Sequence, residues 1–540
     1  MDCSTKAEGR AYHVDFMENH TTDPHHTTLQ EAKSDLLDPE LGKTKALKVT
    51  ADQDGFLVPQ PSDDPQDPLN WSYGKKHAVL AIVIACSFLP DYGSVTGAAT
   101  LTLQAEEYGI SPDEVNHSQS GNQFMVGAGG TIAVMLSAYF GRLPVLFWFM
   151  VAAFATAAGQ AGSNGFIGFF VPRVMNGFFS GVAQGGGLMF IKDLFYLHEQ
   201  ARKINLWQSC VILSPFLGPL LASFMTISLS WRWPFWLYTI LTGLALMGVI
   251  FFGEETFYNR QIPQSAQRDR GSRPLRLIGF EQWRSRSQRN SFVEAVSRSF
   301  TVLGKPVILL TNLYYVCIFA WLVAINATLP IFLTSLYGFG PKQIDQGGAN
   351  TTMLLAGFMY FAPVVAAIVA YTLGHWLHDA LARFYVRRNG GVFHPESRLI
   401  IVWLAMPFML SGLVLVGFAL QQHYHYMLVA LGWGLYTFGM IINSASVNMY
   451  VLNSYPEASG EVGMWINFSR TAGGFIISYF QVEWVSHVGA EAAFGTQAAI
   501  SAFVFPIVIL LQFRGKELRA WGGDLNFKTD SGGGTNWDLQ

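Results

Sequence analysis

Charged side chains are scarce in this chain. Only 13% of its 540 residues are Asp, Glu, Lys or Arg, whereas 51% are hydrophobic. A soluble domain usually has about 25% charged residues, so this composition predicts that most of the chain meets lipid. The net charge of −3 offers no basic surface for a nucleic acid.

Residue patterns for cofactor chemistry are also lacking. The four cysteines are scattered and provide neither a disulfide framework nor a zinc-ligand spacing, at Cys3, Cys86, Cys210 and Cys317. No Gly-x-x-x-x-Gly-Lys-Ser/Thr loop occurs, which argues against an ATP-driven pump. The nearest approach to a catalytic cluster is His375 and His378 beside Asp379, which we place at a membrane interface. We therefore expect neither an enzyme nor a metal or other cofactor.

Long apolar segments make up most of what is present. Each is long enough to cross a bilayer as a helix, which takes about 20 residues. Six precede a basic stretch and six follow it, at about 77–102, 120–140, 144–162, 165–190, 204–228, 232–252, 306–336, 351–374, 399–420, 426–450, 461–485 and 493–513. The count predicts an all-α membrane protein of twelve transmembrane helices in two six-helix halves, 75–252 and 306–514.

The polar segments predict the orientation. Residues 1–74 have too little apolar sequence to fold alone and are expected to be a disordered tail. The linker 253–305 carries ten Lys and Arg residues, and such basic loops stay on the cytoplasmic side. We therefore expect a plasma-membrane protein in which the linker, the N-terminal tail and the C-terminal tail at 515–540 are all cytoplasmic. The sequons at Asn116 and Asn350 then fall outside, where glycosylation is expected.

The segment 165–190 carries a charge at membrane depth. Arg173, Gly177, Ser180 and Gln184 share one helical stripe, and an intramembrane charge costs several kcal/mol unless it faces protein or water. Glycines such as Gly181 allow a neighbouring helix to approach closely. Either the helix only packs and its arginine reaches the interface, or it lines a polar pathway. The rest of the chain favours the second interpretation.

Other polar residues lie inside apolar segments. Asp91 shares a stripe with Ser87 and Ser94, and it is either a buried neutral carboxyl near Pro90 or a proton or cation site. Asn443, Ser446, Tyr450 and Asn453 form a similar stripe. They are interpreted either as hydrogen-bond partners between helices or as groups that bind the substrate. The candidates for a substrate or proton pathway are Asp91, Gln123, Arg173, Gln184, Asn326, Asn443, Tyr450, Asn467 and Arg470.

Charged residues also cluster near the predicted cytoplasmic ends of the helices. They either form a gate that pairs when the inner mouth closes or are solvated loop charges, which contribute under about 1 kcal/mol per pair. The candidates for such a gate are Arg142, Glu199, Arg202, Glu254, Glu255, Asp379, Glu457 and Glu461. Their position slightly favours the gate.

Six short motifs occur in a specific order. They are DPLNW before the first helix, PRVMNGFFSG in the fourth, LGP in the fifth, WRWPFW at 231–236, EETFYNR at 254–260 and SYPEASGEVGMWINFSRTAGGF at 454–475. With these motifs, residues 63–520 resemble the major facilitator superfamily, and within it the fungal drug:proton antiporter-like group that includes relatives of the yeast histidinol and polyamine permease.

The resemblance assigns roles to particular residues. It places the family's Arg-x-x-x-Gly-x-x-x-Gly element at Arg173, Gly177 and Gly181, and its antiporter motif at Gly218 and Pro219. One departure stands out in the loop after the second helix, which keeps a Gly-Arg core. There Ala138 occupies the family's acidic position and Leu143 its second basic position, so half of the expected charge lock is missing.

The resemblance implies a secondary transporter that works by alternating access. We expect proton-coupled export of a small organic compound, such as a drug or secondary metabolite. Uptake of an amine or polyamine is the alternative, and a transporter-like sensor is a third. The expected partners are a small-molecule substrate, protons and the lipid bilayer, and the chain is expected to be a monomer.

The linker provides a test of the predicted orientation. Because basic loops stay inside, a protease added to intact cells should leave 253–305 uncut, whereas the same protease should cleave it in permeabilised cells. Fragments from intact cells that end within the linker would contradict the orientation.

Overall fold

The computed structural model describes residues 61–258, 271–284, 291–337, 357–388, 394–455, 458–523 and 525. The folded part begins inside the segment that was expected to be a disordered tail. Asp67 is buried, caps the short helix η1 (Pro68–Asn70) and accepts hydrogen bonds from Ser62. Ser62 and Asp64 also contact the hydroxyl of Tyr258, and Trp71 is buried in the main hydrophobic core, so the expectation of disorder does not hold for this stretch.

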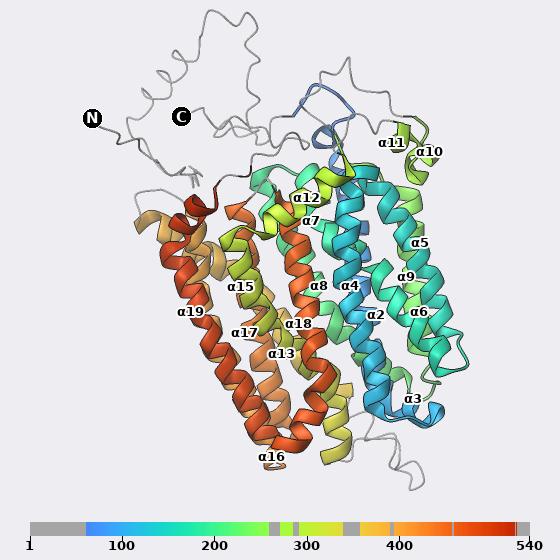
Figure 1. Cartoon of the computed structure of the whole chain (residues 1–540), viewed down its shortest axis with the longest axis vertical. Coiled ribbons are helices and arrows are strands. Elements are labelled where there is room, and N and C mark those ends of the chain that lie inside the picture. Colours follow the sequence, from blue (N-terminus) through green and yellow to red (C-terminus); the bar gives the residue numbers. More distant parts are fainter. Residues whose placement is uncertain are drawn as a thin grey trace, which may run out of the picture.

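The N-terminal half is built from long helices that run alternately up and down. These are α2 (Tyr73–Thr96), α4 (Pro112–Phe140), α5 (Arg142–Ala161), α6 (Phe166–Ser180) with α7 (Val182–Leu194), α8 (Leu197–Met225) and α9 (Trp233–Phe252). The helices α6 and α7 meet at Gly181 and together form the predicted fourth span. After α2, the turn η2 (Gly97–Thr100) and the short helix α3 (Leu101–Tyr108) close one end of this half (Figure 1).

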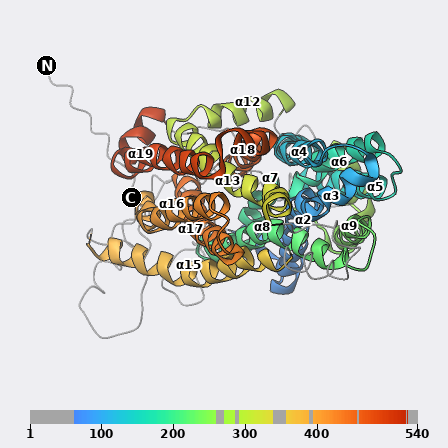
Figure 2. The same ribbon diagram turned by 90° about the horizontal axis from the view of Figure 1, so that it is seen from below.

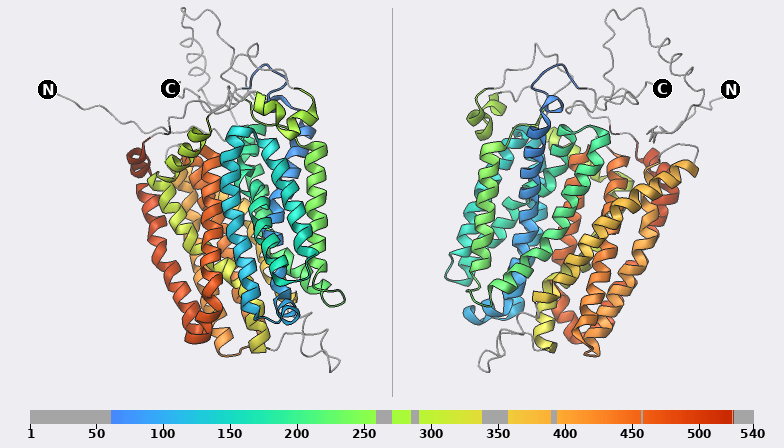
Figure 3. Two further views of the ribbon diagram at one scale, coloured as in Figure 1. Left: turned by 45° about the vertical axis from the view of Figure 1, so that its right-hand side comes forward. Right: turned by 180° about the vertical axis from the view of Figure 1, so that it is seen from behind.

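The C-terminal half repeats this plan. Its long helices are α13 (Pro306–Tyr337), α15 (Phe361–Arg388), α16 (Val402–Gln421) after η6 (Pro395–Ile401), α17 (Tyr426–Ser454), α18 (Ser459–Val488) and α19 (Ala490–Gly522). The linker contributes α10 (Arg273–Ile278), α11 (Phe280–Arg284) and α12 (Phe292–Leu303). These three lie at one end of the bundle, here named the linker end, and α3 lies at the opposite far end (Figures 1 and 3).

The arrangement confirms the predicted twelve-helix membrane fold in two halves. In the described part of the chain, eleven helices are long and apolar enough to span a bilayer. The helix α18 is not among those eleven. It contains Glu461, Asn467 and Arg470, and it packs against both α4 and α13 (Figure 2). It completes the twelve because polar residues of a spanning helix are tolerated where they face protein.

Glycines bring the helices close together where the sequence predicted it. A Cβ added at Gly177 would lie 2.2 Å from the carbonyl oxygen of Asn122 on α4, and one at Gly181 would lie 2.2 Å from that of Val126. The same closeness joins the two halves, because a Cβ at Gly127 of α4 would lie 3.2 Å from the Cα of Phe468 on α18. Small residues thus set the helix spacing both within and between the halves.

This packing generates a stability prediction. The substitution Gly177→Ala should lower the free energy of unfolding by about 1–3 kcal/mol, because the added methyl group must push α4 away. Gly168→Ala on the same helix is the control, since its Cβ would meet nothing nearer than 3.6 Å. Thermal unfolding of the detergent-purified proteins measures the difference. Equal midpoints for the two variants would contradict the close contact.

Candidate functional site

An ion pair between the two halves lies at the centre of the bundle. Asp91 of α2 and Arg470 of α18 are 1% and 5% exposed. Arg470 donates from Nη1 to Asp91 Oδ2 at 2.5 Å and from Nη2 to Oδ1 at 3.3 Å. The guanidinium also lies over the ring of Phe319 on α13, 5.3 Å from its centre. The pair therefore joins the N-terminal half to the C-terminal half with both charges out of water.

Amide side chains from three helices complete this network. Gln184 of α7 donates to Asp91 Oδ2 at 2.8 Å and accepts from Arg470 Nη2 at 2.8 Å. Gln123 of α4 approaches Asp91 Oδ1 at 3.4 Å, and Asn467 accepts from Arg470 at 2.9 Å. A buried ion pair persists only when hydrogen bonds satisfy the rest of its polar atoms. Five of the predicted pathway residues therefore form one connected site.

Arg173 lies apart from the ion pair, inside the N-terminal half. It is 1% exposed and donates from Nη2 to the carbonyl oxygen of Ser94 at 2.8 Å. The rings of Phe169 and Phe235 cover the guanidinium at 5.3 and 5.1 Å. Among the groups that the structure describes, Nε and Nη1 have no hydrogen-bond acceptor. This arginine is thus stabilised by aromatic faces and one carbonyl rather than by a carboxylate.

Ser94 links Arg173 to the central site. While its carbonyl accepts from Arg173, its hydroxyl donates to Gln123 Oε1 at 2.6 Å. A continuous series of contacts therefore runs from Arg173 through Ser94 and Gln123 to Asp91. Ser94 appeared in the sequence only as a member of the Asp91 stripe, and no local signal indicated that it would connect two charged residues.

The remaining pathway candidates do not reach the ion pair. Asn326 of α13 donates to the carbonyl oxygen of Pro215 on α8 at 2.9 Å. This hydrogen bond also joins the two halves. Asn443 accepts from Tyr314 at 2.9 Å within the C-terminal half. Tyr450 is buried toward the linker end, near Gly515. Only the first of these three lies between the halves.

The antiporter-like motif packs against the helix that carries the central carboxylate. A Cβ at Gly218 of α8 would lie 2.6 Å from the carbonyl oxygen of Tyr92, the residue after Asp91. The carbonyl oxygen of the next residue, Pro219, accepts a hydrogen bond from the hydroxyl of Ser223 at 2.8 Å. The motif therefore fixes the distance between α8 and α2 at the level of the ion pair.

Three of the eight predicted gate residues pair within the N-terminal half and the linker. Arg142 forms an ion pair with Asp193 at the end of α7 and donates to the carbonyl oxygen of Met189. Glu255 accepts from the backbone of Arg142 and from Gln282 of α11. Glu254 pairs with Arg276 of α10 at 3.1 Å. These pairs join the N-terminal half to its own helix ends and to the linker, and none of them crosses to the C-terminal half.

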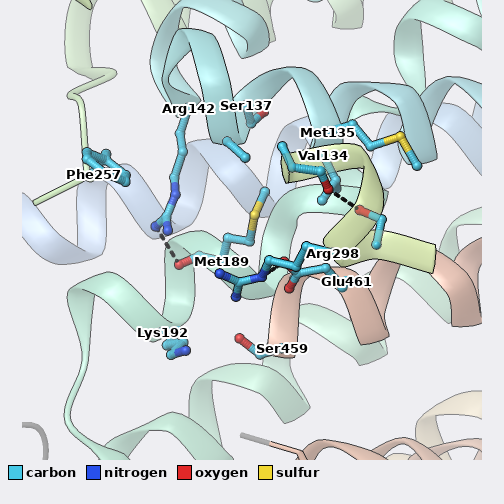
Figure 4. A pocket seen from close by; sticks show the side chains of 14 residues that line it. Val134, Met135, Ser137, Arg142, Met189, Lys192, Phe257, Arg298, Ser459 and Glu461 are labelled. Atoms are coloured by element: carbon cyan, nitrogen blue, oxygen red, sulfur yellow. Dashed lines mark hydrogen bonds and ion pairs between the residues drawn. The ribbon is translucent and has the colours of Figure 1, made fainter. Parts of the chain in front are cut away.

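At the linker end, α12 packs against both halves, and α18 also lies directly against α7, where a Cβ at Gly463 would meet Leu188. Arg298 of α12 pairs with Glu461 of α18 at 2.6 Å, and Trp465 donates to the carbonyl oxygen of Ser299. Beside them is a cavity of about 40 Å³ that is also lined by Ala138 (Figure 4). This volume is large enough for about three water molecules. The linker helix thus supplies a charge contact to α18 beside Ala138.

The other predicted gate and glycosylation residues either make no contact described above or lie outside the described residues. Glu199 is half-buried and Arg202 is exposed. Glu457, Asn350 and the side chain of Asp379 lie outside what the structure describes.

Asn116 is not available to a glycan. The helix α4 begins at Pro112, eight residues before the predicted start, so Asn116 lies inside it. Its side chain is 0% exposed and donates to the carbonyl oxygen of Ser478 on α18 at 3.3 Å. The expected glycosylation at Asn116 was therefore wrong.

Two partners of the site residues were missed in the sequence. Asp193 follows Lys192 at the end of an apolar run, and an acid at that position was the available signal. Phe319 is one of many aromatic residues of α13, and nothing in the sequence distinguishes it from residues that face lipid.

Comparisons with known proteins agree with this architecture. The family model described as Major Facilitator Superfamily matches residues 80–478. The chain is 25% identical over 504 residues to the uncharacterized transporter C1529.01 of Schizosaccharomyces pombe, covering 90% of this chain and 98% of that protein. It is also 25% identical over 465 residues to the MFS transporter fsa7 of a Fusarium species, covering 83% and 88%.

Solved structures show the same fold at low sequence identity. The D-xylose-proton symporter superposes with a TM-score of 0.56 at 16% identity, covering 84% of this chain and 100% of that one. The human organic anion transporter MFSD10 superposes with a TM-score of 0.53 at 17% identity, covering 80% and 99%. With the family model matched over most of its length, the chain belongs to the Major Facilitator Superfamily.

Proposed function

We propose that this transporter is driven by protons and that Asp91 is the group that couples proton movement to transport. The observation that carries the proposal is the buried ion pair between Asp91 and Arg470. It is the type of contact that one proton can break, because a neutral carboxyl no longer attracts the guanidinium. Since the two charges lie on different halves, the loss of that attraction affects the contact between the halves.

The surrounding amides support a two-state role for this pair. When Asp91 is neutral, Gln184 and Asn467 still accept hydrogen bonds from Arg470, but no carboxylate compensates its charge there. A buried charge that loses its partner is destabilised by about 3–5 kcal/mol. Opening the site to water on one side relieves this cost, and alternating access requires such an opening.

The substrate that we propose is a small organic compound, such as a drug or secondary metabolite, and the direction is export. Support comes from the antiporter-like Gly218 and Pro219, which lie against α2 next to the coupling carboxylate. One neighbour by fold is described as a proton symporter for a sugar and another as an organic anion transporter. The central site combines one acid, one base and several amides, which suits a polar organic molecule.

Uptake of an amine or polyamine is the second proposal, and one observation favours it. Asp91 is the carboxylate of the central network, and a substrate ammonium can replace the guanidinium of Arg470 beside it. Competition by amines for transport separates this proposal from export of uncharged compounds.

We also infer that the linker end faces the cytoplasm of a cell whose plasma membrane holds the protein. Support comes from the arginines of α10 to α12, which lie together at that end.

The substitution Asp91→Asn tests the coupling role. It removes the titrating proton at almost constant volume, so the protein should fold while its accumulation of substrate against a gradient falls by about tenfold or more. Screening a panel of radiolabelled drugs, metabolites and amines in proteoliposomes identifies the compound, and uptake is then compared with and without a pH gradient. Exchange of substrate at equal pH should survive in the variant.

Glu396→Gln is the matched control for that experiment. Glu396 is another buried carboxylate, paired with Arg519 at 2.5 Å, but both residues lie in the C-terminal half. This variant should keep its pH-driven accumulation. If Asp91→Asn concentrates substrate as well as the parent does, Asp91 is not the coupling residue.

Arg173 gives a separate test, because its position predicts a role in transport rather than in folding. In Arg173→Lys the charge is kept, but the ammonium lacks the planar fork with which the guanidinium reaches the Ser94 carbonyl while it contacts the rings of Phe169 and Phe235. We expect this variant to reach the membrane in normal amount and to transport about tenfold more slowly. Normal transport by Arg173→Lys, together with failure of Arg173→Ala to accumulate, would show a structural role instead.

A further inference from the structure

A stripe of uncharged polar side chains leads from the central site toward the far end of the bundle. On α4, Asn116, Gln119 and Gln123 are spaced by three and four residues, so they share one helix face. On α18, Ser478 and Gln481 continue the face that carries Arg470. Asn116 donates to the carbonyl oxygen of Ser478, so the two faces meet.

The far-end seam is the name used below for Asn116, Gln119, Ser478 and Gln481. All four side chains are at least 98% buried. The side-chain oxygen of Asn116, the hydroxyl of Ser478 and both amide atoms of Gln119 and Gln481 have no hydrogen-bond partner among the described protein groups. Buried polar atoms are nearly always satisfied by protein or by ordered water.

Water is the partner that fits this seam. A buried water usually makes about three hydrogen bonds to polar groups, and the four side chains supply donors and acceptors at successive helix turns. The helices are too close for an organic substrate, because the ring of His117 stacks on that of Tyr479 at 4.2 Å and Phe124 meets Phe475 at 5.1 Å.

We propose that the far-end seam holds a chain of water molecules that carries protons between the far side of the membrane and Asp91. The inference rests on the proposed role of Asp91 and adds the route by which its proton arrives. Gln123 joins the seam to the carboxylate, because it lies one turn from Gln119 and approaches Asp91 Oδ1 at 3.4 Å.

The proton transfer along this route balances. A hydronium ion at the far side gives a proton to the first water, each water passes one proton to the next, and the last donates to Oδ1 of Asp91. The carboxylate becomes a neutral carboxyl, and a water molecule remains at the far side. The amides and the hydroxyl hold the waters without titrating.

Charged groups lie only at the two ends of the far-end seam. At the inner end, Asp91 faces Arg470, and Arg173 lies behind Ser94. At the far mouth, Asp113 pairs with His117 at 3.7 Å, with Glu483 in electrostatic range. The helix α13, which also packs on α18, has no charged residue in its sequence. Beyond His117 the sequence of α4 contains no Asp, Glu, Lys, Arg or His, and α18 has none between Arg470 and Gln481.

Gln119→Leu tests the route by removing both amide atoms from its middle. Parent and variant are reconstituted in oriented vesicles, and the carboxyl stretching band of Asp91 is identified by infrared spectroscopy from its loss in Asp91→Asn. The pH is then jumped on one face at a time. We expect the variant's Asp91 band to respond about tenfold or more slowly to a far-side jump and at the parent rate to a linker-side jump.

A second variant in the seam and a control variant outside it accompany this test. Ser478→Ala should slow the same far-side response to a smaller extent. Gln160→Leu is the matched control, because Gln160 of α5 is also buried with an unpartnered amide oxygen but lies off the seam. It should respond at the parent rate on both faces.

The possible failures are distinct. If Gln119→Leu and Ser478→Ala both respond to the far-side jump at the parent rate, the seam is not the route, and the coupling role of Asp91 stands. Equal slowing on both faces would show damage to the central site and would also overturn the route. If Asp91 shows no titrating band in the parent protein, the coupling role fails and the route fails with it.

Discussion

The ion pair between Asp91 and Arg470 is the contact on which the relation of the two halves depends. In a bilayer the hydrophobic effect does not hold helices together, because lipid tails are as apolar as the side chains they would replace. What joins two membrane halves is close packing and polar contact. Here a charge from each half meets at the centre with amides from both sides, so one protonation event acts on the contact between them.

Close packing and polarity are arranged along the same two helices. Toward the linker end, α4 and α18 approach through Gly127 and Gly130. Toward the far end, the same pair presents Asn116, Gln119 and Ser478. Glycine allows van der Waals contact that is insensitive to protons, whereas amides require partners that water supplies. The contact between α4 and α18 therefore combines a closely packed part with the far-end seam, whose buried polar atoms lack protein partners among the described groups.

The sequence predicted the helices well because hydropathy marks most segments that enter a bilayer, and eleven of the described helices are apolar enough to span one. It also identified Asp91, Arg173 and Arg470, since charges in apolar segments are costly and therefore conspicuous. It did not decide which arginine pairs with Asp91, because the answer depends on how α18 packs against α2, more than 370 residues away in the chain. The burial of Asn116 was missed for the same kind of reason.

The two membrane-depth arginines differ in a way that bears on the energetics of the cycle. Arg470 is compensated by a carboxylate, whereas Arg173 rests against two phenyl rings and a carbonyl. Among these three central charges, the net charge is +1 with Asp91 ionised and becomes +2 when it is protonated. A site with two uncompensated cations in a medium of low dielectric constant is unfavourable until water or an anion reaches it. In the proposed cycle, protonation of Asp91 would therefore do more than release one contact, because it would favour the conformation that admits water to Arg470.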